Sequence, residues 1–376
     1  MSTLMRKAAK ALAMNVKPIR ELIESRATLL AERDDADNRS RMYIEERDLA
    51  IIKRDVATRE RDLAIETCER TKVERDKALQ EIVEVRKVAQ NAFDRLHDFG
   101  ERPFVPNGHF YSPIPLLSEF EKHKERIYGD VGRTLPGVDL NESGQIDLLE
   151  LFRVAYKDLP FPDEQTAGFR YHYKNPAYGH SDAIFLNMMI RHAKPRRVIE
   201  IGSGYSSCML LDTNERWFDN SIDCTFIEPY PQLLHSLLKK GDAERVKIIP
   251  TGVQDVGIEL FQTLEANDIL FVDSTHVSKV GSDVNEIVFK VLPALASGVF
   301  VHFHDIFYPM EYPADWIEEG RAWNEAYLLR AFLQHNSVFE VVMFNTFMQQ
   351  FHRVFFEEHM PLCLKNTGAS IWLRKR

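Results

Sequence analysis

From Tyr178 onward the sequence alternates between short apolar runs and amphipathic stretches, and this alternation limits the possible folds more than any other feature. Each apolar run has the length of a buried strand, and the stretches between them have helical spacing. Regular alternation of strand and helix indicates a doubly wound, parallel α/β sheet. The predicted strands are Val198–Ile201, Cys224–Ile227, Val246–Ile249, Ile269–Val272 and Val299–Phe303, with helices such as Leu233–Lys240 and Val284–Leu295 between them. Two later strands, Glu340–Phe344 and Ser370–Leu373, lack a full helix between them, and we expect them to form an antiparallel edge.

The first predicted strand ends in an acidic residue and a Gly-x-Gly turn. The segment reads Glu200-Ile201-Gly202-Ser203-Gly204-Tyr205. Glycines let a ligand approach the backbone closely, and the helix that follows offers unpaired N–H groups. The third glycine of a dinucleotide-binding motif is absent, since Ser207 stands near that position, and Glu200 would repel a pyrophosphate. The turn therefore favours a cationic or hydroxyl-rich ligand.

Polar residues also follow the second and third predicted strands. Glu228 lies 24 residues beyond Gly204, at the end of the second strand. A carboxylate at this point of such a sheet accepts hydrogen bonds from the two hydroxyls of a ribose. Gln254 and Asp255 follow the third strand and are candidates for contacts with an adenine ring.

Two histidines and two aspartates follow the fourth and fifth predicted strands. Asp273 and His276 come after the fourth strand, and His304 and Asp305 end the fifth. Ligands of open α/β sheets bind beyond the carboxyl ends of the strands, so these side chains should converge. Asp273, His304 and Asp305 could hold a divalent cation such as Mg²⁺, or the set could work as a metal-free acid–base cluster. Because imidazole has an unperturbed pKa of about 6.5, His276 or His304 is the expected catalytic base at neutral pH, with Asp305 and Asp273 orienting it or holding the ion.

The N-terminal part of the chain has a different composition. Residues 1–20 are basic, whereas residues 21–97 are rich in Glu, Arg, Asp and Ala and contain neither Gly nor Pro. Glu-Arg-Asp triplets recur there at multiples of seven residues, which predicts one long helix. The expected structure is a coiled coil that joins copies into a homo-oligomer. One half of the expected seam holds arginines where a coiled coil prefers apolar residues. The alternative is therefore a solvated, charged helix that acts as a spacer.

Residues 98–170 connect this helix to the α/β domain, which we expect to span residues 171–376. The connection is rich in Pro and aromatic residues and predicts a packed linker with short accessory helices, interrupted at Pro136–Gly137.

Composition excludes several classes of protein. The net charge of -9 argues against a nucleic-acid partner. The four cysteines are scattered without a C-x-x-C pair, so neither a zinc site nor a disulfide framework is expected, and a cytoplasmic location fits best. No apolar run approaches the roughly 20 residues that a membrane span needs.

From about Phe104 to the C-terminus, the chain resembles the class I, Rossmann-like methyltransferases that use S-adenosylmethionine, and in particular a bacterial group often found near polysaccharide or glycosyltransferase functions. Beside the Glu200 turn, the segments that carry the resemblance are Phe110–Pro115, Asn175–Gly179, Phe226–Pro231, Asp273–His276, His302–Phe307 and Trp323–Glu325. The resemblance implies a seven-stranded sheet and S-adenosylmethionine as cofactor. The residues implied to bind it are Tyr178, Gly179, Glu200, Gly202, Ser203, Gly204, Tyr205, Glu228, Gln254, Asp255 and Asp273.

The leading hypothesis is O-methylation of a hydroxyl on a small molecule or a glycan. Methyl transfer needs an oriented acceptor and a base for its proton. Two alternatives remain. One is an oxidoreductase that uses NAD(P) on the same general fold, against which Glu200 and the missing third glycine count. The other is an inactive methyltransferase fold that serves assembly through its coiled coil.

Overall fold

The computed structural model describes residues 104–376 and six isolated positions, 25, 26, 28, 77, 82 and 86. The chain divides into two compact units, Met1–Pro103 and Phe104–Arg376. Apart from the six positions, which are helical, the basic segment 1–20 and the predicted long helix 21–97 lie outside the described residues. The coiled coil therefore stays a prediction.

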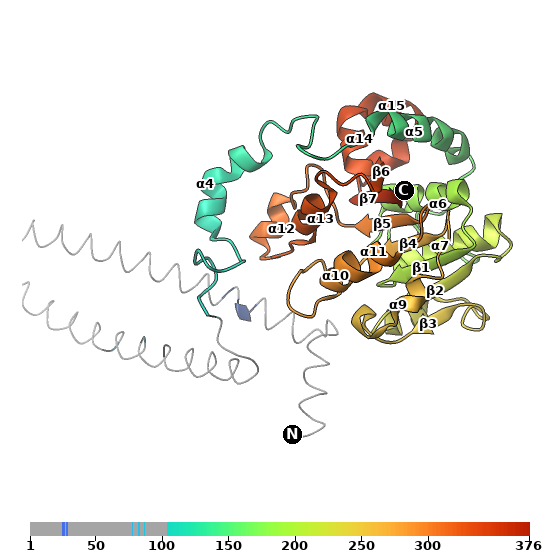
Figure 1. The fold of residues 1–376 in the computed structure, drawn as a ribbon, viewed down its shortest axis with the longest axis horizontal. Helices are drawn as coiled ribbons and strands as arrows, with labels where there is room; N and C mark the ends of the chain where they lie inside the picture. Colours follow the sequence, from blue (N-terminus) through green and yellow to red (C-terminus); the bar gives the residue numbers. More distant parts are fainter. Residues whose placement is uncertain (1–24, 27, 29–76, 78–81, 83–85, 87–103) are drawn as a thin grey trace, which may run out of the picture. The chain divides into compact units, whose positions relative to one another are not determined.

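The second unit is built on a seven-stranded sheet with the order β3-β2-β1-β4-β5-β7-β6 (Figure 1). The strands are β1 (Arg197–Ile201), β2 (Asp223–Ile227), β3 (Lys247–Ile249), β4 (Ile269–Val272), β5 (Phe300–His304), β6 (Phe339–Phe344) and β7 (Ser370–Lys375). β1 to β5 pair in parallel, whereas β7 runs antiparallel to both β5 and β6. The predicted doubly wound sheet is confirmed, with strand ends shifted by one or two residues. The central strands β4 and β5 are buried along their whole length, as expected for strands covered on both faces.

The sequence from Ser181 to Ile190 is buried throughout and forms most of the central helix α6 (His180–Ala193), which packs against α7 (Tyr205–Trp217). The remaining elements on the α/β sheet are α8 (Gln232–Leu237), η1 (Val253–Asp255), α9 (Ile258–Phe261), α10 (Asp283–Glu286), η2 (Ile287–Val291), α11 (Leu292–Ala294), α12 (Ala314–Glu318) and α13 (Glu325–Leu333). The predicted helix Val284–Leu295 is present as α10, η2 and α11 in succession, with a π-helical turn at its centre.

Two helices occupy the connection between β6 and β7, which corrects the expectation that no full helix lies there. α14 (Asn345–Phe351) and α15 (Arg353–His359) are followed by the turn η3 (Pro361–Leu364). Each helix has only seven residues, too few for a clear amphipathic period, and helices of this length depend on packing for stability. α14 packs against α6 and both late strands. The predicted antiparallel pairing of β6 with β7 is confirmed.

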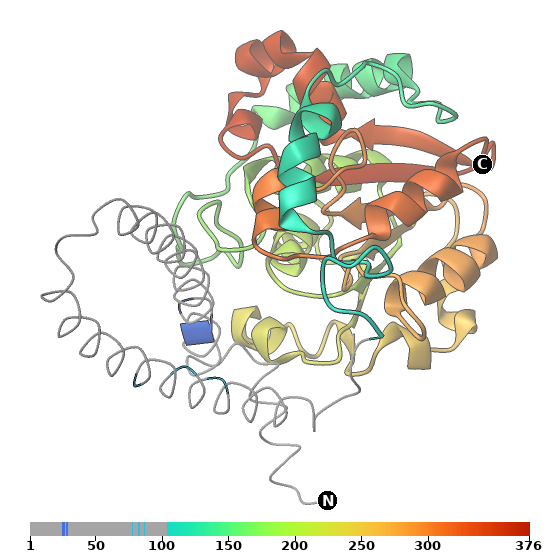
Figure 2. The ribbon, with the colours of Figure 1, turned by 90° about the vertical axis from the view of Figure 1, so that its left-hand side faces the viewer.

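The accessory helices α4 (Leu117–Tyr128) and α5 (Glu142–Tyr156) flank the Pro136–Gly137 break, as predicted. α4 packs against α12, where Tyr128 donates a hydrogen bond to the Tyr312 carbonyl over 2.7 Å, and α5 packs against β6 (Figure 2). Both helices are thus part of the same compact unit as the sheet. Among the described residues, no helix has the length and hydropathy needed to cross a membrane.

Candidate active site

The turn after β1 can be built only from glycine at its first position. Gly202 has a φ of +79°, and a Cβ there would lie 1.8 Å from the backbone oxygen of Asp273. Its N–H donates to the Ile227 carbonyl at the end of β2 over 3.0 Å. The N–H of Ser203 donates to Glu228 Oε2 over 3.1 Å. The turn is therefore held between the ends of β2 and β4, at the edge where ligands of open α/β sheets bind.

The side chain of Glu200 is buried next to this turn. Its carboxyl group is 1% exposed and accepts a hydrogen bond of 2.5 Å from Ser206 Oγ, in the first turn of α7. Burial raises the pKa of Glu200 to about 8. Gly204 is the N-cap of α7, and its N–H donates to Ser207 Oγ over 3.1 Å. Tyr205 is the first residue of the helix and is half-buried.

Glu228 connects the end of β2 to the turn. Besides the Ser203 N–H, its carboxylate accepts from the N–H of Tyr230 over 2.8 Å, and the side chain is half-buried. Gln254 and Asp255 lie exposed on η1, beyond the end of β3, where Gln254 Nε2 donates to the Gly281 carbonyl over 3.0 Å.

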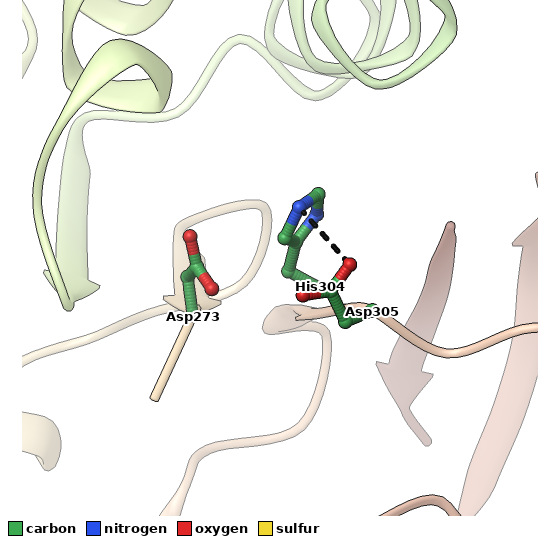
Figure 3. A group of neighbouring side chains, drawn as sticks. All are labelled: Asp273, His304 and Asp305. Atoms are coloured by element: carbon green, nitrogen blue, oxygen red, sulfur yellow. Dashed lines mark ion pairs between the residues drawn. The ribbon is translucent and has the colours of Figure 1, made fainter. Parts of the chain in front are cut away.

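The structure brings the four polar side chains after β4 and β5 together. Asp273 faces His304 and Asp305 across the gap between the two strand ends (Figure 3), and ligand atoms of these three residues lie within 4.8 Å of one another. His304 Nε2 lies 3.6 Å from Asp305 Oδ1. His276 Nε2 lies 3.4 Å from Asp273 Oδ1 and 3.5 Å from Asp305 Oδ2, so this ring faces both carboxylates.

Glu325 completes the cluster, although no sequence pattern indicates a role for it. Its Oε2 lies 2.9 Å from His276 Nδ1, and the Glu325 side chain is 1% exposed at the start of α13. The N–H groups of Asn324 and Glu325 both donate to the His276 carbonyl, and the Trp323 ring lies 4.3 Å from the imidazole. In the sequence, Trp323–Glu325 is only one of the segments that carry the family resemblance. A glutamate in the first turn of a helix is common because it favours the helix dipole, so its position alone did not distinguish it.

The backbone of the cluster is strained at two positions. His276 has a φ of +60° and Asp305 a φ of +55°, a region that residues other than glycine seldom adopt. Such conformations cost free energy and persist only where the surroundings enforce them, as the contacts from Asn324 and Glu325 do for His276. Strain of this kind clusters at functional sites, which agrees with the chemistry of the side chains.

The charges of the cluster shift its pKa values. Burial opposes protonation of His276, but hydrogen bonds to Asp273 and Glu325 raise its pKa to about 10. Burial likewise opposes protonation of His304, while Asp305 and Asp273 raise its pKa. Burial disfavours the charged form of Asp273, but the two histidines lower its pKa. The carboxylate partners of His276 favour its protonated form at neutral pH, and the role of His276 or His304 as the base stays a prediction.

A pocket of about 440 Å³ adjoins His304 and Asp305. The loop before α6 and the loop before β7 form its walls, together with Phe307 and Trp316. The buried ring of Tyr178 lies 5.2 Å from the His304 ring, and Gly179 is the N-cap of α6. His276 is not among the residues that line this pocket.

Part of the chain, including the segment from Glu200 to Asp305, is similar to known proteins. A family model described as "Methyltransferase domain" matches residues 199–306. An uncharacterized protein of Archaeoglobus fulgidus is 36% identical over 170 residues, which cover 44% of this chain and 75% of that protein. The sheet order and the turn after β1 define a class I methyltransferase fold. The chain belongs to the class I methyltransferase family.

Solved structures similar to this chain include the SAH-bound methyltransferase PaMTH1 of Podospora anserina, with 16% identity, a TM-score of 0.36, and coverage of 73% of this chain and 100% of that chain. The O-methyltransferase from Bacillus cereus in complex with SAH has 11% identity, a TM-score of 0.34, and coverage of 68% and 97%.

Proposed function

We propose that the protein is an S-adenosylmethionine-dependent O-methyltransferase that acts on a hydroxyl of a small molecule or a glycan. The observation that carries this proposal is the convergence of Asp273, His276, His304 and Asp305 beyond β4 and β5, beside both the Gly202 turn and a pocket. The turn and the pocket supply neighbouring places for a cofactor and an acceptor, and the cluster lies where the two would meet.

The proposed cofactor site uses the strand ends from β1 to β4. Glu228 would hold the ribose hydroxyls; each carboxylate oxygen has two lone pairs, so the backbone N–H groups that it already binds leave capacity for them. Glu200, buried beside the turn, would accept a hydrogen bond from the ammonium group of the methionine part, whose charge would favour the carboxylate form of Glu200. The remaining proposed contacts come from Tyr178, Gly179, Gly202, Ser203, Gly204, Tyr205 and Asp273, with Gln254 and Asp255 near the adenine.

When bound, S-adenosylmethionine supplies an electrophilic methyl group, so the work of the protein is to position the acceptor hydroxyl and remove its proton. His304 is the best placed base, because it lines the pocket and its Nδ1 is buried without a hydrogen-bond partner. Asp305 adjoins it and would stabilise the imidazolium that forms. His276, held by Glu325, would orient the two aspartates.

A divalent cation is a further proposal for the same cluster. Asp273, His304 and Asp305 offer two carboxylates and an imidazole within reach of one ion, a donor set that suits Mg²⁺ or Mn²⁺ in type. His276 counts against an ion, because its protonated ring already faces both carboxylates and would repel a second positive charge.

The two alternative functions make different predictions. Membership of the methyltransferase family argues against an oxidoreductase that uses NAD(P). An inactive assembly protein would bind partners through residues 21–97 and show no turnover. The experiment that tests the proposal is a screen of hydroxyl acceptors with labelled S-adenosylmethionine, run with added Mg²⁺ and with chelator. Transfer of label to an oxygen would support the proposal, whereas label found only on nitrogen, or on no acceptor, would contradict it.

A further inference from the structure

One end of the pocket, which Tyr173 and His180 line, contains two buried polar groups that lack partners. Tyr173 and His180 both line the pocket, and their rings stack in parallel with centroids 4.7 Å apart. Tyr173 is 4% exposed and His180 9% exposed, yet the Tyr173 hydroxyl and His180 Nε2 have no hydrogen-bond partner. A buried polar group without a partner is costly, and such groups beside a pocket indicate that a ligand supplies the missing hydrogen bonds.

Positive charge gathers at the same end of the pocket. α6 begins there at His180, and no side chain caps its N-terminus, which therefore carries the positive end of the helix dipole. Lys365 is exposed in the pocket wall and forms no ion pair within the part of the chain that the structure describes. Burial lowers the pKa of His180, the charges of Lys365 and Lys174 lower it further, and the charge of Asp163 raises it.

The loop that carries Lys365 is fixed against α6. The N–H of Ser181 donates to the Asn366 carbonyl over 3.2 Å, and a Cβ at Gly179 would lie 2.6 Å from the Asn366 side chain. Asp182 is the carboxylate at this end, and its oxygens accept hydrogen bonds from the Ala369 N–H and from Asn345. Burial raises the pKa of Asp182, while His304 and the hydrogen bond from Ala369 oppose the shift. The loop that carries Lys365 and the start of α6 are therefore held in place by contacts within the protein.

We propose that this end of the pocket binds an acidic group, a carboxylate or a phosphate, on the acceptor molecule. Lys365, the N-terminus of α6, His180 Nε2 and the Tyr173 hydroxyl would bind the anion, while the acceptor hydroxyl would lie toward His304 and Asp305. The acceptor assignment rests on the proposed methyltransferase function, whereas the anion site rests on the pocket alone.

The test uses inorganic phosphate and acetate as probes on the full chain. Thermal unfolding is followed while each anion replaces chloride at constant ionic strength, in the wild type, in Lys365→Met and in the control Lys290→Met, an exposed lysine on η2. We expect a saturable rise in melting temperature in the wild type and the control, with an affinity at least ~10-fold lower in Lys365→Met, the scale of one lost charged hydrogen bond. Saturation by phosphate alone or by acetate alone would identify which acid the acceptor carries. No saturable effect of either anion, or an equal loss in both variants, would overturn the proposal.

Calorimetry of S-adenosylmethionine separates this site from the cofactor site. Lys365→Met should bind S-adenosylmethionine within about 2-fold of the wild type, less than one charged hydrogen bond would cost. A loss of ~10-fold or more would mean that the site takes the carboxylate of the cofactor, which contradicts an acceptor site. If the wild type fails to bind S-adenosylmethionine while the anion effect persists, the proposed function fails and the anion site stands. Methylation of an acidic acceptor by Lys365→Met as fast as by the wild type would also contradict the proposal.

Discussion

Nδ1 of His276 lies 2.9 Å from Oε2 of Glu325, and both side chains are buried. This contact leaves Nε2 of the same ring facing Asp273 and Asp305. One carboxylate from the start of α13 thus fixes a ring after β4, and the ring in turn orients the carboxylates at the ends of two strands. We therefore predict that Glu325 positions the side chains of the candidate site.

Removal of the Glu325 carboxylate should destabilise the fold through His276. Glu325→Ala leaves Nδ1 of a buried ring without its partner, and we expect a loss of ~1–3 kcal/mol in the free energy of unfolding. Glu325→Gln keeps the size of the side chain and should recover part of that loss. Urea unfolding measures both variants, with the exposed Glu319→Gln as control. Equal stability of Glu325→Ala and the wild type would show that the contact contributes nothing.

Loss of the base should abolish most of the turnover while cofactor binding persists. Replacing His276 and His304 singly by Ala should leave the affinity for S-adenosylmethionine intact, and at least one variant should lose ~100-fold or more in turnover, the scale of a lost general base. We expect the larger loss for His304→Ala, because His304 lines the pocket. Single-turnover kinetics on an acceptor from the screen decides this. Near-normal rates in both variants would mean that the cluster is structural.

Glu200 should make the protein less stable as the pH rises. Burial raises its pKa from an ordinary value of 4.5 to about 8. Between these values the folded protein keeps a proton that the unfolded chain releases, so stability falls as the pH increases through this window and levels off above it. Glu200→Gln cannot ionise and should remove a slope approaching ~1 kcal/mol per pH unit. Urea unfolding of both proteins at several pH values within this window measures the difference, and parallel curves would contradict the assigned burial effect.

The segment before α6 is tied to α7 by a buried ion pair network that should be needed for stability. Arg170, with its side chain 1% exposed, donates to Asp212 over 2.7 Å and to both oxygens of Asp242 over 2.6 and 2.7 Å. Removing one partner of a buried pair leaves uncompensated charge, so Arg170→Met should cost ~3–5 kcal/mol in the free energy of unfolding. The exposed pair of Arg153 with Glu150 offers the control, since Arg153→Met should cost less than ~1 kcal/mol. Similar losses in the two variants would refute the importance of the buried network.

Local patterns predicted the sheet and the meeting of the strand-end residues. Apolar runs indicated the strands because both faces of a parallel sheet are covered. Ligands of such sheets bind beyond the carboxyl ends of the strands, which predicted that Asp273 and His304 lie close together. The part played by Glu325 could not be predicted in this way, since it comes from a helix start 49 residues beyond His276 and meets it only through the fold. The high pKa of His276 could not be predicted either, because it depends on burial and on two carboxylates whose distances no sequence pattern contains.

The most direct test of the central claim is calorimetric titration of the full chain with S-adenosylmethionine and with NAD. We expect S-adenosylmethionine or its demethylated product to bind, and Glu228→Ala to weaken that binding by at least ~1 kcal/mol, because the variant loses charge-assisted hydrogen bonds to the ribose and the support that Glu228 gives the Ser203 N–H. Tighter binding of NAD than of S-adenosylmethionine would contradict the claim.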